Sequence, residues 1–226
     1  MTSAQPGLLF DLDGTLVHTD PVHMKAFNQM LEPFGRQVDE AFYKAHVMGR
    51  QNAAIMRDIF PDMPEAERTR LADAKEAGFR SMAGLLEPLT GLLRLLAAAE
   101  RAQVPCCIVT NAPRANARLM LEALGLARRF DVIVIGDEME QAKPHPMPYL
   151  TGLARLGSDA ARSVAFEDSR SGVAAAAAAG LAVVGLTTSL DEGELIAAGA
   201  TLAVPNFADD RLLDLVRERT GLRLDA

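Results

Sequence analysis

Five short apolar segments, separated by longer stretches with helical periodicity, constrain the fold of this chain more than any other feature. Each segment ends near a polar residue or a glycine, and together they cover residues 8–10, 105–109, 132–135, 164–166 and 182–186. Helical spacing marks the intervals 92–103, 114–124, 146–156 and 172–179. Strands that alternate with helices of this length predict an α/β fold: a Rossmann-like parallel sheet with helices on both faces. Ligands of such sheets bind at the carboxyl ends of the strands.

One interval breaks this alternation, because no convincing strand is present from Val17 to Leu86. Helical spacing covers four stretches there, at 22–31, 39–47, 51–59 and 65–85. Proline and glycine in the segment 87–91 suit a linker that returns the chain to the sheet. We therefore expect a core built from residues 1–16 and 88–226, and a small all-helical cap formed by residues 17–87.

The composition is that of a globular protein and limits the partners. Hydrophobic residues make up 49% of the chain and charged residues 23%, which excludes collagen-like and disordered classes. Because the chain has 23 Lys and Arg residues but 30 Asp and Glu residues, its formal net charge is −7 at pH 7. A negative surface repels polyanions, so we expect no nucleic-acid partner, although a small anion can still bind locally. No pattern in the sequence fixes an oligomeric state.

Three features bear on the compartment. Cys106 and Cys107 are adjacent within an apolar run, and we interpret them as small buried hydrophobic residues in a reducing compartment. Residues 1–7 lack the basic and apolar segments of a secretory signal, so we expect a cytoplasmic location. Residues 171–190 carry no charge, over the length of a membrane span. Their alanine-rich composition and Gly180 favour a helix, a turn and a strand instead, so we expect no membrane partner.

The first apolar segment runs directly into the sequence Asp11-Leu12-Asp13-Gly14-Thr15. Side chains two positions apart in an extended backbone point the same way, so both carboxylates are expected to face one spot. Two like charges held close need a partner, and a hard divalent cation such as Mg²⁺ is the natural one. An ordinary acidic turn is the alternative, because Asp and Gly are both common in turns.

Other strand ends carry polar side chains that suit a phosphate. Thr110 and Asn111 offer a hydroxyl and backbone N–H groups at the turn into a helix. The ammonium of Lys143 can offset phosphate charge, and Glu167 and Asp168 form a second acidic pair. Each feature alone is common on a protein surface. Acids, a hydroxyl and a cation at the ends of separate predicted strands form a constellation that indicates a site.

In the order and spacing of these motifs, the chain resembles the haloacid dehalogenase-like superfamily. The likeness is to its branch with a small helical cap, which includes β-phosphoglucomutase and the phosphoglycolate and sugar phosphatases. It runs from about Leu8 to Leu186, which is most of the chain. The residues similar to the four motifs of the family are, in order, 11–15, 110–111, 143–144 and 167–172.

The resemblance implies a reaction through an aspartyl-phosphate on Asp11, whose carboxylate is already ionised at neutral pH. Asp13 would protonate the departing oxygen and then take a proton from the attacking water, which requires surroundings that raise its pKa. An acid at this position favours phosphate esters over halide removal, because a halide leaves as a stable anion and needs no proton.

The resemblance also implies a Mg²⁺ cofactor. The ion would be held by the Asp11 carboxylate, the Asp13 backbone carbonyl and Asp168. Glu167 would act on it directly or through a water. The transferring phosphoryl oxygens would contact the hydroxyl, backbone N–H and ammonium groups of Thr110, Asn111 and Lys143.

Four cap residues match positions that relatives use for substrate: His23, Gly49, Arg50 and Lys75. The alternative for each is a solvated residue, because a lone helical His, an Arg after a Gly and a Lys on a charged helix are usually exposed. His18 occupies a hinge position where the mutases of the family carry Asp or Glu, which argues against mutase activity.

The prediction is a Mg²⁺-dependent phosphatase for a small phosphorylated metabolite: a sugar or polyol phosphate, with phosphoglycolate among the candidates. A mutase similar to β-phosphoglucomutase is the first alternative, because it would use the same intermediate and cap residues. A regulatory module that has lost turnover is the second, and the complete set of motif residues argues against it. A phosphorelay receiver also combines Asp, Thr, Lys and Mg²⁺, but it needs no helical insert.

Overall fold

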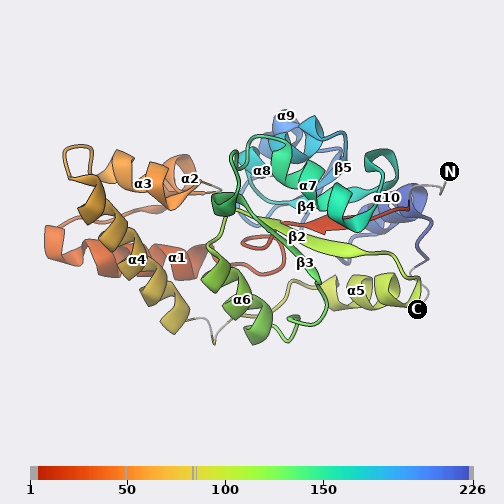
Figure 1. Ribbon diagram of the computed structural model, residues 1–226, viewed down its shortest axis with the longest axis horizontal. Helices are drawn as coiled ribbons and strands as arrows, with labels where there is room; N and C mark the ends of the chain where they lie inside the picture. Colours follow the sequence, from red (N-terminus) through yellow and green to blue (C-terminus); the bar gives the residue numbers. More distant parts are fainter. Residues whose placement is uncertain (1–4, 49, 83, 85, 224–226) are drawn as a thin grey trace.

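A six-stranded parallel sheet, in the order β3-β2-β1-β4-β5-β6, forms the centre of the molecule (Figure 1). The computed structural model describes residues 5–48, 50–82, 84 and 86–223. The strands are β1 (Leu8–Phe10), β2 (Cys106–Thr110), β3 (Val132–Ile135), β4 (Val164–Glu167), β5 (Ala182–Leu186) and β6 (Leu202–Val204). The strand order reverses at β1 and β4, which creates the crevice where open parallel sheets bind ligands.

Helices cover both faces of the sheet. Those after the cap are α5 (Leu92–Arg101), α6 (Arg114–Ala123), α7 (Met147–Leu156), α8 (Arg170–Ala178), α9 (Glu192–Ala198) and α10 (Asp210–Thr220), with 3-10 turns η3 (Gly136–Glu138) and η4 (Ala160–Arg162). Side chains of a strand alternate between faces. Phe10 therefore packs with α5, α6 and α10, whereas Leu9 packs with α7, α8 and α9. Two buried cores therefore lie against one sheet.

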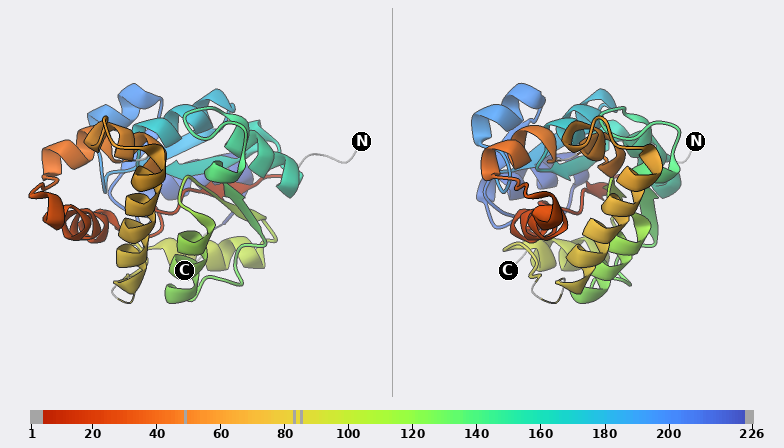
Figure 2. Two further views of the ribbon diagram at one scale, coloured as in Figure 1. Left: turned by 60° about the vertical axis from the view of Figure 1, so that its left-hand side comes forward. Right: turned by 90° about the vertical axis from the view of Figure 1, so that its left-hand side faces the viewer.

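The interval without strands folds into a helical unit beside the sheet, and the name cap is used below for its helices α1–α4. It contains α1 (Asp20–Leu31), the 3-10 turn η1 (Glu32–Phe34), α2 (Glu40–His46), α3 (Asn52–Ile59) and α4 (Glu65–Ser81). A third core, with Phe27 and Met56 fully buried, joins these helices to one another. Figure 2 shows the helices α1–α4 at one end of the sheet, with α4 near α6. Arg80 Nη1 on α4 donates to Asn116 Oδ1 on α6 at 3.0 Å, which fixes this contact.

The predicted α/β fold is confirmed, and most predicted elements lie within two residues of the observed ones. The uncharged stretch 171–190 forms α8, a turn and β5, as expected. No helix in the described ranges is long and apolar enough to cross a membrane. The helix predicted at 65–85 ends earlier, at Ser81. Strand β6 and helices α9 and α10 were not predicted.

Candidate active site

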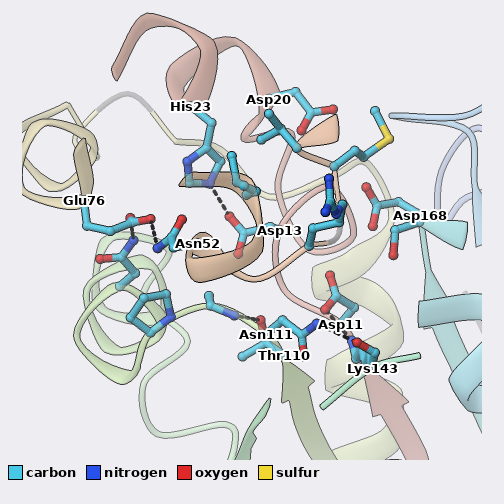
Figure 3. A pocket seen from close by; sticks show the side chains of 18 of the residues that line it. Asp11, Asp13, Asp20, His23, Asn52, Glu76, Thr110, Asn111, Lys143 and Asp168 are labelled. Carbon is cyan, nitrogen blue, oxygen red and sulfur yellow. Dashed lines mark hydrogen bonds and ion pairs between the residues drawn. The ribbon is translucent and has the colours of Figure 1, made fainter. Parts of the chain in front are cut away.

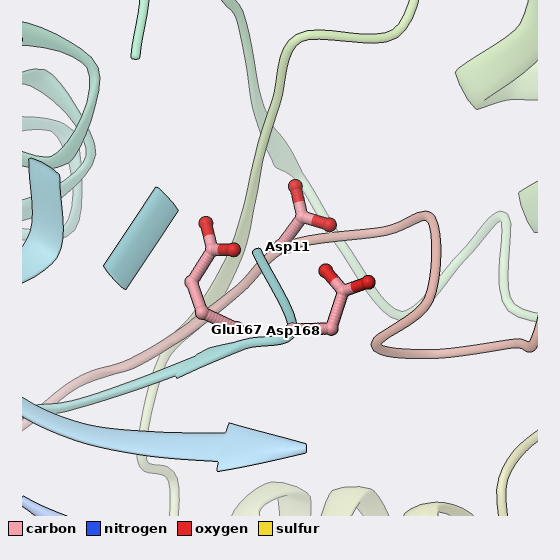
Figure 4. Close-up of side chains that lie close together, drawn as sticks. All are labelled: Asp11, Glu167 and Asp168. Atoms are coloured by element: carbon pink, nitrogen blue, oxygen red, sulfur yellow. The ribbon is translucent and has the colours of Figure 1, made fainter. Parts of the chain in front are cut away.

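The ends of β1 and β4 bring three carboxylates together. Asp11 follows β1, Glu167 is the last residue of β4, and Asp168 follows it. One carboxylate oxygen from each residue lies within 4.8 Å of the others (Figure 4). All three side chains are buried, although carboxylates are seldom buried unless they are paired. The two acidic segments therefore meet at the crevice of the sheet.

The ammonium of Lys143 lies between two of these carboxylates. Lys143 belongs to the loop between η3 and α7, and its Nζ lies 2.6 Å from Asp11 Oδ1 and 2.5 Å from Glu167 Oε1. A third hydrogen bond, of 2.6 Å, runs to the carbonyl oxygen of Val109. Burial lowers the pKa of Lys143, but the charges of Asp11 and Glu167 outweigh burial and raise it. The lysine is therefore a fixed positive charge beside Asp11.

One lysine does not balance three buried carboxylates. Burial raises the pKa of Asp11 well above its ordinary value, and the charge of Lys143 offsets only part of this. Burial also raises the pKa of Asp168, with further contributions from the charges of Asp11 and Asp20. Bringing a cation to these oxygens would relieve the repulsion. A donor set made of carboxylate oxygens fits a hard divalent ion.

Two glycines allow this close packing. Gly14 has a positive φ of +73°, and a Cβ atom there would lie 1.9 Å from Asp168 Oδ2. A Cβ atom at Gly172 would lie 1.9 Å from Glu167 Oε2. Both distances are far below a van der Waals contact, so each glycine leaves space for a carboxylate of the site.

A hydroxyl links Asp168 to the cap. Ser189 Oγ lies 2.6 Å from Asp168 Oδ2 and 2.7 Å from Asp20 Oδ2. The other oxygen of Asp20 accepts a hydrogen bond of 2.9 Å from the Tyr43 hydroxyl on α2. A hydroxyl has one hydrogen, so it can donate to only one of the two carboxylates at a time. This is a second sign that the acidic cluster needs additional positive charge.

Asp13 faces the cap and not the carboxylate cluster. His23 Nε2 on α1 lies 2.9 Å from Asp13 Oδ1 (Figure 3). Lys75 Nζ on α4 lies 3.0 Å from His23 Nδ1. An ammonium can only donate, so His23 Nδ1 accepts and Nε2 carries the hydrogen that is donated to Asp13. Burial alone raises the pKa of Asp13, but the contributions of His23, Thr19 and Lys75 together outweigh it, so the pKa lies below its ordinary value. The acid role implied by the resemblance requires surroundings that raise this pKa, and the contact with His23 explains the opposite direction.

The second motif lies at the end of β2. The Thr110 hydroxyl accepts a hydrogen bond of 3.0 Å from the backbone N–H of Ala112, which leaves its own hydrogen to donate. Asn111 Nδ2 donates to the carbonyl oxygen of Lys143 at 3.4 Å. The loops that carry the second and third motifs are therefore held together.

A cavity opens over these residues between the core and the cap (Figure 3). Asp11, Asp13, Thr110, Asn111, Lys143 and Asp168 line it from the core, and His23, Arg50 and Lys75 line it from the cap. Arg50 Nη1 donates to Asp58 Oδ2 at 2.7 Å, so this guanidinium is held by its own cap. Gly49 lies outside the described residues. Glu167 is at the base of the carboxylate cluster, fully buried.

Several polar residues of the site were missed by sequence reasoning. The Tyr149 hydroxyl donates to Glu167 Oε1 at 2.6 Å, and Ser189 contacts Asp168. On the cap side, Glu76 accepts hydrogen bonds from Asn52 and Asn116. The signal for Ser189 was available, because it lies just beyond the predicted strand at 182–186. Asn52 and Asn116 come from α3 and α6, far from Glu76 in the sequence, and neither had a local signal.

A sequence model of the haloacid dehalogenase-like hydrolases matches residues 8–186. The chain belongs to the haloacid dehalogenase-like hydrolase family. This confirms the resemblance drawn from the four motifs, and it establishes the enzyme class as a hydrolase.

Two curated proteins and one solved structure are similar to this haloacid dehalogenase-like hydrolase over most of its length. The phosphorylated carbohydrates phosphatase of Thermotoga maritima is 31% identical over 218 residues, covering 93% of this chain and 98% of the relative. The fructose-1-phosphate phosphatase of Escherichia coli is 33% identical over 180 residues, which cover 79% of this chain and 94% of the relative. The crystal structure of CbbY from Rhodobacter sphaeroides in complex with phosphate has a TM-score of 0.80 and 27% sequence identity. The match covers 91% of this chain and 96% of the CbbY chain.

Proposed function

We propose that this hydrolase is a Mg²⁺-dependent phosphatase that acts on a small phosphorylated metabolite, a sugar or polyol phosphate or phosphoglycolate, through an aspartyl-phosphate. The observation that carries the proposal is the buried meeting of Asp11, Lys143, Glu167 and Asp168, three of which (Asp11, Lys143 and Asp168) also line the cavity. Both curated relatives described above are named as phosphatases of phosphorylated carbohydrates or of fructose 1-phosphate.

In this proposal Asp11 is the nucleophile. Lys143 holds its Oδ1 at 2.6 Å and fixes the orientation of the carboxylate at the end of β1. A carboxylate attacks without a separate base to activate it. The Thr110 hydroxyl, the backbone N–H of Asn111 and the Lys143 ammonium would stabilise the charge on the phosphoryl oxygens.

Asp13 is the proposed acid and base for the leaving-group oxygen and the water. Its carboxylate lines the cavity and contacts His23, so both residues face the side from which a leaving group enters. The proton would move at the carboxylate oxygens of Asp13, and because the contact with His23 lowers the pKa of Asp13, the acid role requires this contact to loosen when the substrate binds.

The residues that would hold Mg²⁺ are Asp11 and Asp168, with Glu167 and the backbone carbonyl of Asp13 completing the set. The oxygen donors and the excess negative charge described above fit this ion. When bound, it would shield the carboxylate nucleophile from its anionic target.

The cap is proposed to supply substrate contacts and to exclude water. We assign residues 17–87 to it, with Gly49 and the cavity-lining His23, Arg50 and Lys75 as substrate-binding residues. The two connections to the core run side by side, because Leu89 N–H donates to Leu16 carbonyl oxygen at 2.8 Å. Paired connections of this kind suit a hinge between residues 1–16 and 88–226.

A hydrolysis screen tests the proposal. Purified protein with Mg²⁺ is given sugar phosphates, polyol phosphates, phosphoglycolate and nucleotides, and inorganic phosphate is measured. We expect phosphate release by the wild type and a loss of at least about 10³-fold in the Asp11→Asn variant. An isomerised sugar phosphate without phosphate release would favour the mutase alternative. Full activity in Asp11→Asn would contradict the assigned nucleophile.

A further inference from the structure

The end of the cavity remote from Asp11 contains a buried carboxylate that the proposed reaction does not use. Glu76 on α4 is 5% exposed and lines the cavity together with Asn52 and Asn116. Figure 3 shows Glu76 and Asn52 at one end of the cavity and Asp11, Lys143 and Asp168 at the other. The transferring phosphoryl group would lie at the second end, so Glu76 faces the rest of the substrate.

Glu76 is held in place by three donors from three helices. Lys75 Nζ and Asn52 Nδ2 each donate to its Oε1 at 2.7 Å. Asn116 Nδ2 on α6 donates to its Oε2. The charge of Lys75 and these hydrogen bonds outweigh burial, so the pKa of Glu76 is lowered. The carboxylate is therefore a rigid and ionised part of the cavity wall.

The cations that line the cavity are already committed. In the described part of the chain they are Arg50, Lys75 and Lys143. Lys75 lies 2.7 Å from Glu76, and its Nζ also lies 4.6 Å from the centroid of the Phe27 ring. Arg50 is paired with Asp58 at 2.7 Å. In the described part of the chain, each cation at the cap end of the cavity is thus already paired with a carboxylate.

The same wall can both donate and accept hydrogen bonds. A carboxylate has about four acceptor positions, and the three donors leave one on Glu76. An asparagine amide has two N–H donors and a carbonyl oxygen, so Asn52 keeps capacity beyond its bond to Glu76. A hydroxyl both donates and accepts, so it suits this wall. A phosphate or a carboxylate would bring a negative charge next to Glu76, and Lys75, already paired with Glu76, offers no further charge to balance it.

We propose, on the basis of the proposed phosphatase function, that Glu76 is a specificity residue that excludes a second anionic group. The substrate class is then a phosphate monoester of an uncharged polyhydroxy compound. Bisphosphates and phosphoglycolate are rejected, because each brings a second charge toward Glu76. Asn52 and Asn116 position the carboxylate and contact hydroxyl groups of the leaving alcohol.

The test compares kcat/KM for a hexose 1-phosphate and the corresponding 1,6-bisphosphate. We expect wild-type protein to favour the monophosphate by at least about 30-fold, and Glu76→Gln to reduce this ratio by about tenfold. Glu67→Gln is the matched control, because Glu67 is an exposed residue of the same helix. Its ratio should equal that of the wild type. If Glu76→Gln does not fold, Asn52→Asp replaces it, and the added negative charge should increase the ratio.

Each outcome separates this inference from the proposed function. Equal hydrolysis of both esters by the wild type, or an unchanged ratio in Glu76→Gln, would overturn the inference and leave the phosphatase function standing. Hydrolysis of no ester would contradict the function instead. If no ester is hydrolysed, calorimetric titration of the wild type with the two hexose phosphates tests the inference by itself. Weaker binding of the bisphosphate would support the exclusion of a second anionic group, and tighter binding would contradict it.

Discussion

Gly14 makes room for the carboxylate of Asp168: a Cβ atom on Gly14 would lie 1.9 Å from Asp168 Oδ2. The two residues are far apart in the sequence, one just after β1 and the other just after β4. These strands are neighbours in the sheet, in register from Leu8 with Val164 to Phe10 with Phe166. Gly14 of the first motif is therefore required for two reasons: its backbone has a positive φ, and the carboxylate of Asp168 from the fourth motif occupies the space of a Cβ atom.

We expect Gly14→Ala to be much more harmful than Gly35→Ala. Gly35 also has a positive φ, of +62°, but nothing lies within 4 Å of a Cβ atom there. The Gly35 substitution should therefore cost only the left-handed backbone strain, about 1 kcal/mol of unfolding free energy. Gly14→Ala carries the same strain and must also displace Asp168. Urea unfolding of both variants measures the difference, and equal losses would contradict the assigned packing.

Removing the ammonium of Lys143 should strongly destabilise the fold. Lys143→Met leaves Asp11 and Glu167 buried without their partner, and breaking a buried pair in this way costs about 3–5 kcal/mol. Lys25→Met is the control, because Lys25 is exposed on α1. Urea unfolding at neutral pH should show a change below about 0.5 kcal/mol for the control. A loss under about 1 kcal/mol in Lys143→Met would show that the pair is not closely coupled.

Divalent metal should stabilise the folded protein. An ion that binds only the folded state at 100 times its Kd adds about 2.7 kcal/mol, so Mg²⁺ should raise Tm and EDTA should reverse the change. Asp168→Asn removes one oxygen donor of the cluster, and its Tm should respond little to Mg²⁺. Asp62→Asn, at an exposed position of the cap, should keep the wild-type response. A response to Mg²⁺ that is equal in all three proteins would place the ion elsewhere.

The parts of the fold that were predicted have strong local patterns. The strand at 182–186 is a run of apolar residues, and its observed bounds agree with the prediction. Strand β6 has three residues and α9 seven, which are too few to establish a period, and neither is followed by a polar motif of the kind that marks the equally short β1. The apolar spacing of α10 was present in the sequence and was overlooked. Strand β6 and α9 are stabilised by tertiary packing, because Leu195 of α9 and Ala203 of β6 are buried in the same core as Val183.

The same distinction holds for the site. Asp11, Glu167 and Asp168 could be predicted to converge because parallel strands end at one edge of a sheet. Side-chain pairing across domains could not be predicted in this way. Asn116 contacts Glu76 from 40 residues away, and neither residue ends a strand. The lowering of the pKa of Asp13 was missed for the same reason, because it depends on contacts with the cap, mainly with His23.

The two cysteines should be unreactive in the native protein. Burial raises the pKa of Cys106 to about 12 and raises that of Cys107 still further, and Cys107 has no exposed surface. The thiolate is the reactive form, and at pH 8 only about one Cys106 thiol in 10⁴ is ionised. A disulfide reagent should therefore titrate no thiol within minutes, and both thiols once urea unfolds the chain. Single Cys106→Ser and Cys107→Ser variants assign any residual reaction to its residue. Rapid titration of native Cys107 would mean that the face of β2 under α7 opens readily, and would contradict the close packing of that core.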